Sequence, residues 1–288
     1  MRWMVAFLSG NYHLKTLMYE QQLSTINPGL ILILVDQSAS MRTKYADSCK
    51  ADFAALAVNR VIGEIIQACT AGEEIKDRCH VGVIGYGSKS ELLFIDSASQ
   101  LATNTNVIDI PKRISDGAGG FIEVSQVLRV FIPSVSQGST DMAGAFRLAY
   151  QGIEKFISHF QHSFPPIIIN ITDGEPDNMN ETKTAVQDVQ RLKTSDGSAI
   201  VMNAYISDSK GLQIQLPASS ESFQSNRYAQ FLYDISSVLP EPILAESINA
   251  GFDASQGSRG FIFNADPDAL VRFLRFGTSV DVALVKRD

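Results

Sequence analysis

Two stretches of the sequence are apolar at nearly every position rather than at alternate positions. They are residues 29–35 and 166–171. A strand of this kind is buried on both faces, which is typical of a parallel sheet covered by helices on both sides. Apolar residues at helical spacing follow at about 51–70 and precede the second strand at 141–160. The pattern therefore predicts an α/β fold.

The rest of the chain continues the alternation of strand and helix, except for segment 96–137, where only a loop at 116–120 can be predicted from composition. We predict one doubly wound, mostly parallel sheet with helices on both faces and one antiparallel edge strand. The remaining expected elements are strands at 80–86, 199–206 and 260–263, an antiparallel edge at 91–95, a helix at 182–194, two short helices within 226–251 broken at Pro240 and Pro242, and a last helix at 268–276.

No linker, repeat or low-complexity tract divides the chain. The prediction is therefore one domain at 26–278, with an N-terminal tail at 1–25 and a C-terminal tail at 279–288. The apolar run near the N-terminus is shorter than the usual core of a signal peptide and no cleavage site follows it. We expect the natural start at Met18, and the alternative is a local docking role for residues 1–17.

Composition narrows the classes of partner. The 288 residues include 24 basic and 31 acidic side chains, giving a net charge of −7 without any basic run. This argues against nucleic acid or an anionic membrane as the main partner. Three cysteines, none in a close pair, support neither a disulfide framework nor a zinc site and suit a reducing compartment. No apolar run approaches the ~20 residues that span a bilayer, so a cytoplasmic location is expected.

Oxygen-bearing side chains follow both apolar strands. Asp36, Ser38 and Ser40 come after the first strand, Asp173 comes after the second, and Thr140 precedes the helix at 141–160. In doubly wound folds ligands bind beyond the carboxyl ends of the strands, where the strand order reverses. Carboxylates and hydroxyls without sulfur or clustered imidazole favour Mg²⁺ or Mn²⁺ over zinc. The sequence therefore predicts a five-residue metal site.

Each of these residues also has a structural interpretation. The three hydroxyls could cap helices, and Asp173 could begin a turn with Gly174. Their joint occurrence after two core strands favours metal binding. Neighbouring acids, including Asp141, Glu175 and Asp177, are expected to be solvated charges, with a supporting role for Asp141 or Glu175 as the alternative.

At these positions the sequence closely resembles the von Willebrand factor A (vWA) domain family. The metal-ion-dependent adhesion site (MIDAS) of that family is written D-x-S-x-S, a threonine in a later loop, and an aspartate after the fourth strand. Asp36, Ser38 and Ser40 match the first element, Thr140 the second and Asp173 the third. The resemblance covers about residues 26–278, although Ala39 stands where many members have glycine.

The resemblance implies a binding module rather than an enzyme, in which Mg²⁺ or Mn²⁺ captures an Asp or Glu of a protein partner. Stretches 81–87, 164–175 and 259–266 resemble stand-alone bacterial A-domain proteins. Some of those are associated with phosphatase-like and serine/threonine-kinase-like proteins, which implies a signalling or stress-response complex.

Two other functions stay open at this point. One is a Mg²⁺- or Mn²⁺-dependent phosphate hydrolase, which is disfavoured because no general base, lysine or arginine recurs in the site loops. His159 and His162 fall at the end of a predicted helix, where a capping role is favoured over metal ligation. The other function is a scaffold in which the metal is purely structural.

Residues 1–17 generate the first prediction, because they show neither a membrane-length run nor a clean amphipathic period. A chain that starts at Met18 should unfold at the same temperature and bind metal with the same affinity as the full chain. Thermal unfolding and a Mg²⁺ titration of both proteins check this. A large fall in melting temperature on truncation would contradict it.

Overall fold

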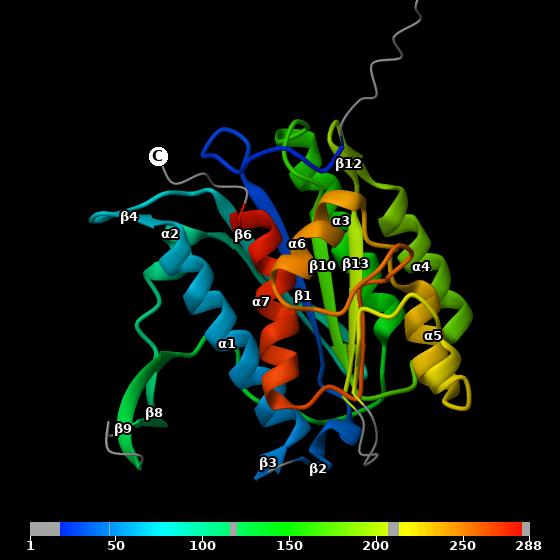
Figure 1. The fold of residues 1–288 in the computed structure, drawn as a ribbon, viewed down its shortest axis with the longest axis horizontal. Coiled ribbons are helices and arrows are strands. Elements are labelled where there is room, and N and C mark those ends of the chain that lie inside the picture. The colour runs from blue at the N-terminus through cyan, green and yellow to red at the C-terminus, as the bar shows by residue number, and fades with distance from the viewer. Residues whose placement is uncertain (1–17, 46, 116–119, 207–212, 284–288) are drawn as a thin grey trace, which may run out of the picture.

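The strand Gly29–Asp36 (β1) lies in the middle of the main sheet, and its apolar residues are buried along its whole length. The computed structural model describes residues 18–45, 47–115, 120–206 and 213–283. Within these residues the main sheet has seven strands (Figure 1). In their order across the sheet they are β14 (Ile214–Gln215), β15 (Phe261–Phe263), β13 (Ile200–Tyr205), β10 (Ile167–Thr172), β1, β6 (Cys79–Tyr86) and β7 (Ser90–Ser97).

The strand order reverses beside β1. The next main-sheet strand in the sequence, β6, lies on one side of β1, and the later strand β10 lies on the other. All pairs from β6 to β15 are parallel, which confirms the predicted doubly wound, mostly parallel sheet. β7 is the expected antiparallel edge. At the opposite edge, β14 forms a second antiparallel pair, which was not predicted because this strand has only two residues.

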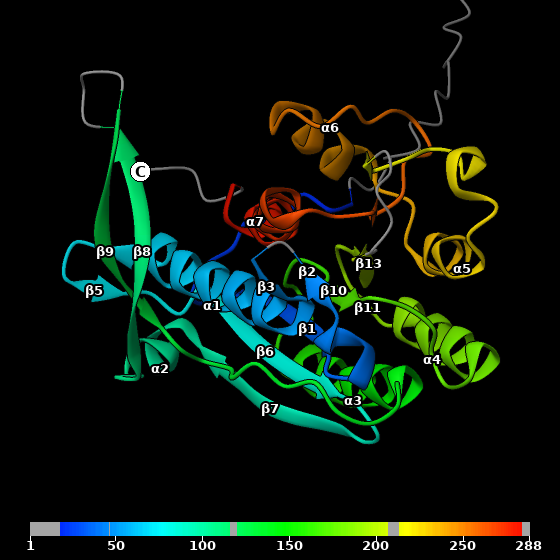
Figure 2. The same cartoon turned by 90° about the horizontal axis from the view of Figure 1, so that it is seen from below.

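Helices cover both faces of the sheet (Figure 2). Odd-numbered residues of β1, from Ile31 to Val35, enter one apolar core, and even-numbered residues, from Leu30 to Leu34, enter the other. This alternation follows from the period of two along a strand. The first core contains α1 (Lys50–Ala68), α2 (Ala98–Ala102), α6 (Glu241–Asn249) and α7 (Pro267–Ala283), and the second contains α3 (Met142–His159), α4 (Met179–Arg191) and α5 (Arg227–Ile235).

Several helix boundaries differ from the sequence prediction. Helix α4 begins three residues earlier than expected, because the Asn178 side chain caps it by accepting the backbone N–H groups of Asn180 and Glu181. Pro242 does not break a helix. It lies in the first turn of α6, where a missing N–H leaves no helical bond unmade. Helix α7 runs to Ala283, well past the expected end.

The segment that gave no clear pattern contains a long hairpin of β8 (Val107–Ser115) and β9 (Phe121–Arg129). The hairpin projects from the body beside α1 (Figure 2). Its base is fastened by Asn59 of α1, whose side chain accepts the N–H groups of Phe131 and Ile132 and donates to the carbonyl of Ile132. Most of the predicted loop at 116–120 lies outside the described residues.

The first described residues pack against the rest of the domain. The hydroxyl of Tyr19 donates to the carbonyl of Ser198, and Leu23 is buried in the core. Residues 1–17 lie outside the described residues.

The remaining short elements of the described residues are two 3-10 helices and three two-stranded pairs. The 3-10 helices are Ala39–Arg42 and Glu221–Phe223. The strand pairs are β2 (Lys44–Tyr45) with β3 (Ser48–Cys49), β4 (Thr70–Ala71) with β5 (Glu74–Ile75), and β11 (Lys193–Thr194) with β12 (Gly197–Ser198).

A chain of buried polar side chains runs across the sheet from β6 to β13 and reaches Ser236, the C-cap residue of α5. The Tyr86 hydroxyl donates to Asn170 Oδ1 at 2.7 Å, and the Asn170 amide donates to Asn203 Oδ1 at 2.9 Å. The Asn203 amide then donates to the Ser236 hydroxyl oxygen at 2.9 Å. Each of these groups is satisfied by the next, so the chain adds no unpaired polar atom to the core.

Breaking this chain should cost stability. Asn203→Ala removes the acceptor of Asn170 and leaves a small cavity, so we expect a loss of about 2–4 kcal/mol in the free energy of unfolding. Asn180→Ala, at an exposed position of α4, is the matched control and should change stability by less than about 0.5 kcal/mol. Urea unfolding of the three proteins measures both, and equal effects would contradict the prediction.

Candidate metal centre

Strand pairing places Asp36 beside Thr172. Val35 of β1 pairs with Ile171 of β10, so the next residues of both strands emerge together at the carboxyl edge of the sheet. Asp36 is 1% exposed. Its Oδ1 accepts the backbone N–H of Ser38 at 2.8 Å, and its Oδ2 accepts the Thr172 hydroxyl at 2.6 Å. Thr172 was not among the predicted site residues, and it fixes the orientation of the first of them.

Burial governs the ionisation of Asp36. Loss of contact with water raises the pKa of Asp36 to about 6, and the negative charge of Asp173 adds to the rise. The hydrogen bonds from Ser38 and Thr172 oppose it, because they favour the charged carboxylate. With this pKa most Asp36 side chains are ionised at pH 7, as a metal ligand must be.

The two serines connect the strand ends. Ser38 Oγ lies 2.9 Å from Ser40 Oγ, and the Ser40 hydroxyl donates to Asp173 Oδ1 at 2.6 Å. Four of the five predicted residues therefore form one connected group. Ser38 is buried and Ser40 is exposed, so the group opens to solvent on the side of Ser40.

The loop that carries Thr140 is tied to the loop of the two serines. Gly138 accepts the backbone N–H of Ala39 at 3.0 Å, and Gln137 donates its N–H to the carbonyl of Gln37 at 2.6 Å. Gly138 has a φ of +84°, and a Cβ there would lie 2.1 Å from the Ser88 hydroxyl and 2.9 Å from its backbone nitrogen. Only glycine fits this close approach without displacing the loop.

Asp177 holds Thr140 in place. Its carboxylate accepts the Thr140 backbone N–H at 2.9 Å, and its own N–H donates to the Thr140 carbonyl at 3.0 Å. Among the described residues no side chain hydrogen-bonds to the Thr140 hydroxyl, which leaves that oxygen available as a ligand. The sequence pattern predicted a solvated charge at Asp177. It is the neighbouring acid that supports the threonine loop.

The other two neighbouring acids make different contacts. Asp141 caps α3 by accepting the Gly144 N–H at 3.0 Å, and it also accepts the Ser90 hydroxyl. Glu175 accepts the hydroxyl of Tyr228. These contacts belong to the local structure around α3 and α5.

A lysine reaches the centre although the site loops contain none. Lys50 begins α1, and its Nζ lies 2.8 Å from Asp173 Oδ2 with both side chains almost fully buried. It stands four residues before Ala54, on the buried face of α1. A lysine on an otherwise apolar stripe is the signal that could have identified it, because such a side chain needs a partner of opposite charge.

The chemistry of these side chains fits a hard cation. Two carboxylates and three hydroxyls offer only oxygen, the donor type that Mg²⁺ and Mn²⁺ prefer. In the described part of the chain, no group of three or more His, Cys, Asp or Glu side chains is arranged to hold a metal ion. That Asp36, Ser38, Ser40, Thr140 and Asp173 hold a metal stays a prediction.

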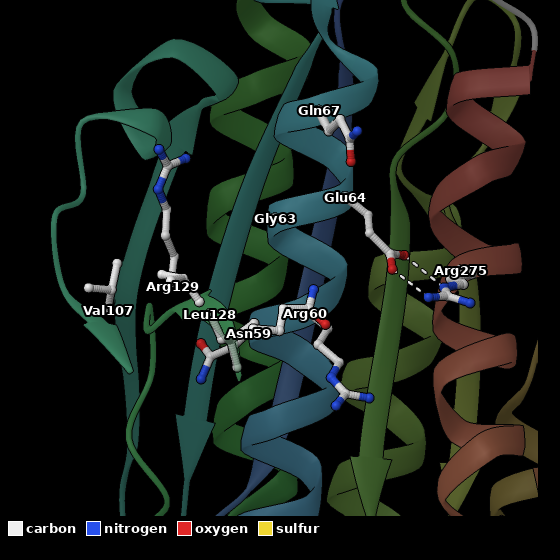
Figure 3. A pocket seen from close by; sticks show the side chains of 11 residues that line it. Asn59, Arg60, Gly63, Glu64, Gln67, Val107, Leu128, Arg129 and Arg275 are labelled. Carbon is white, nitrogen blue, oxygen red and sulfur yellow. Dashed lines mark hydrogen bonds and ion pairs between the residues drawn. The ribbon is translucent and has the colours of Figure 1, made fainter. Parts of the chain in front are cut away.

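A separate cavity of about 630 Å³ lies between α1, the β8–β9 hairpin and α7. It is lined by Arg60, Arg129 and Arg275, which could suggest an anion site. Figure 3 shows that the three guanidinium groups point in different directions, and Arg275 is paired with Glu64 at 2.5 Å. This arrangement does not converge on one ligand.

No protein-family model and no curated protein sequence matches the chain. Its fold is similar to that of the pilus adhesin SpaC from Lactobacillus rhamnosus GG, with a TM-score of 0.54 and 14% identity over 91% of this chain and 31% of that one. A von Willebrand factor type A structure from Catenulispora acidiphila has a TM-score of 0.44 and 12% identity over 92% and 48% of the two chains.

Proximal thread matrix protein 1 from the mussel byssus, in a structure with a zinc-occupied MIDAS motif, has a TM-score of 0.47 and 11% identity over 90% and 49%. The chain spans less than half the length of each of these three structures. The likeness concerns the fold alone. Among the described residues, no helix combines the length and apolar character needed to cross a bilayer.

The raised pKa of Asp36 generates a pH prediction. Its pKa of about 6 in the folded protein exceeds the ordinary aspartate value of 3.8, so between these pH values the folded protein retains a proton that the unfolded chain releases. The contribution to stability is present below pH 3.8 and is lost as pH rises through about 6. The full loss is about 3 kcal/mol.

Unfolding in EDTA between pH 4 and pH 7 tests this against Asp36→Asn, which cannot titrate. As pH rises from 4 to 7, the unfolding free energy of the wild type should fall relative to that of the variant. Parallel pH profiles would contradict the assigned pKa.

Proposed function

We propose that this protein is a metal-dependent protein-binding module of the vWA type. Asp36, Ser38, Ser40, Thr140 and Asp173 hold Mg²⁺ or Mn²⁺, and an Asp or Glu side chain of a partner completes the coordination. The observation that carries the proposal is the connected group of Asp36, Ser38, Ser40 and Asp173 at the point where the strand order reverses.

The ligand set favours capture of an external anion. Three of the five groups are neutral hydroxyls, so a divalent ion bound by them keeps much of its positive charge. The bound ion supplies a Lewis-acidic position for a carboxylate. Ser40, Ser139 and Asp177 are exposed around this position, so a side chain of another protein can approach it.

A cavity of about 440 Å³ is lined in part by the loops that carry the predicted ligands. Gln37 and Gly138, from the loops of the predicted serines and threonine, form part of its wall. Lys89 and Glu91 also line it, which gives the cavity both signs of charge. We propose that residues next to the captured acid lie against this wall and provide specificity, since the metal itself would accept any accessible carboxylate.

Phosphate hydrolysis is the weaker proposal. It needs a general base beside the metal. Of the described histidines, His80 lies at the start of β6, His159 ends α3 and His162 follows α3, all away from the carboxyl edge of the sheet. Lys50 is engaged with Asp173. A phosphatase assay with Mg²⁺ or Mn²⁺ distinguishes this function from binding.

The wider setting rests on the family resemblance alone. We propose a cytoplasmic role in a bacterial signalling or stress-response complex with kinase- or phosphatase-type proteins. Retention of such partners from an extract of the native cell in Mg²⁺, and their release by EDTA, would support this. A scaffold with a purely structural metal would retain the same partners after removal of the metal.

Two substitutions distinguish the residues needed for Mg²⁺ affinity from those needed for partner binding. Asp36→Ala removes one of two predicted carboxylate ligands, so Mg²⁺ affinity and partner retention should both be lost. Thr140→Ala removes a neutral hydroxyl and should weaken partner retention more than Mg²⁺ affinity, because both carboxylates remain. Ser158→Ala, at an exposed hydroxyl near the end of α3 and away from the carboxyl edge of the sheet, is the control and should change neither.

Calorimetry with Mg²⁺ and retention from native extract with and without EDTA measure these effects. Undiminished partner retention by Asp36→Ala, or by the wild type in EDTA, would show that the metal is not the recognition element.

A further inference from the structure

Lys50 carries a buried positive charge, which both the loss of hydration and the local helix dipole disfavour. It is the first residue of α1, where the helix dipole presents its positive end, and its side chain is 3% exposed. Lysine is almost never fully buried unless it is paired. The contact of 2.8 Å with Asp173 Oδ2 offsets the cost of burying the two charges separately.

Asp173 has both carboxylate oxygens engaged. Oδ2 accepts the Lys50 ammonium at 2.8 Å, and Oδ1 accepts the Ser40 hydroxyl at 2.6 Å. Because Ser40 in turn lies beside Ser38, the contacts that start at Lys50 run through three of the five proposed ligands. A metal ion that draws on Asp173 therefore shares its carboxylate with an ammonium group.

We infer that Lys50 and the metal ion compete for the carboxylate of Asp173, so that metal binding at this centre is an exchange of cations. This inference rests on the proposed function of the site. Two positive charges close together at a buried position repel each other, so Lys50 weakens the affinity for the metal. While no metal is bound, the same ammonium balances Asp173 and keeps the site loops together. The centre then responds to metal concentration instead of holding its ion permanently.

The test compares the wild type with Lys50→Met. Removal of the competing charge should increase the affinity for Mg²⁺ at least tenfold in calorimetric titrations. In EDTA the variant should melt at a temperature lower by about 5 °C or more, because Asp173 keeps a buried charge without its partner. Added Mg²⁺ should therefore raise the melting temperature of Lys50→Met more than that of the wild type.

Lys44→Met is the matched control, because it removes an exposed lysine from the neighbouring strand β2. It should change neither the Mg²⁺ affinity nor the melting temperature in EDTA. Lys50→Gln, which can still donate a hydrogen bond to Asp173, repeats the comparison if Lys50→Met does not fold in EDTA.

The outcomes separate this inference from the proposed function. Equal or weaker Mg²⁺ affinity in the Lys50 variants would overturn the exchange and leave the proposed function standing, because Lys50 would then only orient Asp173. Failure of the wild type and the variants alike to bind Mg²⁺ or Mn²⁺ would refute both.

Discussion

The pairing of β1 with β10 is the constraint on which the candidate centre depends. The two strands are more than a hundred residues apart in the sequence, yet they run side by side and in parallel. This pairing places Asp36, at the end of β1, beside Thr172 and Asp173 at the end of β10. Helices on both faces bury the pair, and the reversal of strand order leaves the carboxyl edge open between the emerging loops. The oxygen cluster is therefore a product of sheet topology, and the loops only refine it.

Charge then determines what such a cluster can do. Asp36, Asp173 and Lys50 together carry one net negative charge when all three are ionised. A divalent ion among them would turn the centre positive, and a carboxylate from outside would restore neutrality. The hydroxyls would make this possible because they contribute oxygen without charge. An additional aspartate in place of one hydroxyl would leave less positive charge for a partner, although it would bind the ion more tightly.

The sequence was informative wherever a pattern repeated and much less so where a single contact decided the outcome. Uninterrupted apolar runs identified β1 and β10, and their positions predicted which oxygen-bearing side chains meet. The β8–β9 hairpin was missed, although Ile108 and Ile110 alternate on one strand and Ile122 and Val124 on the other, because the strand interior also contains a proline. Asp177 and Lys50 were missed for another reason: their roles depend on residues 37 and 123 positions away in the chain, which no local period reveals.

The buried amides of β10 and β13 have a consequence for how the chain finds its alignment. Apart from them, the two strands present apolar or weakly polar side chains to the core, and such strands can slide past each other by two residues without exchanging their faces. Asn170 pairs directly with Asn203. A slide of two residues would set Asn170 against Val201 or Tyr205 and break the hydrogen bond between the two amides. The pair therefore distinguishes the native alignment from its nearest competitors, and it stabilises one arrangement chiefly by penalising the others.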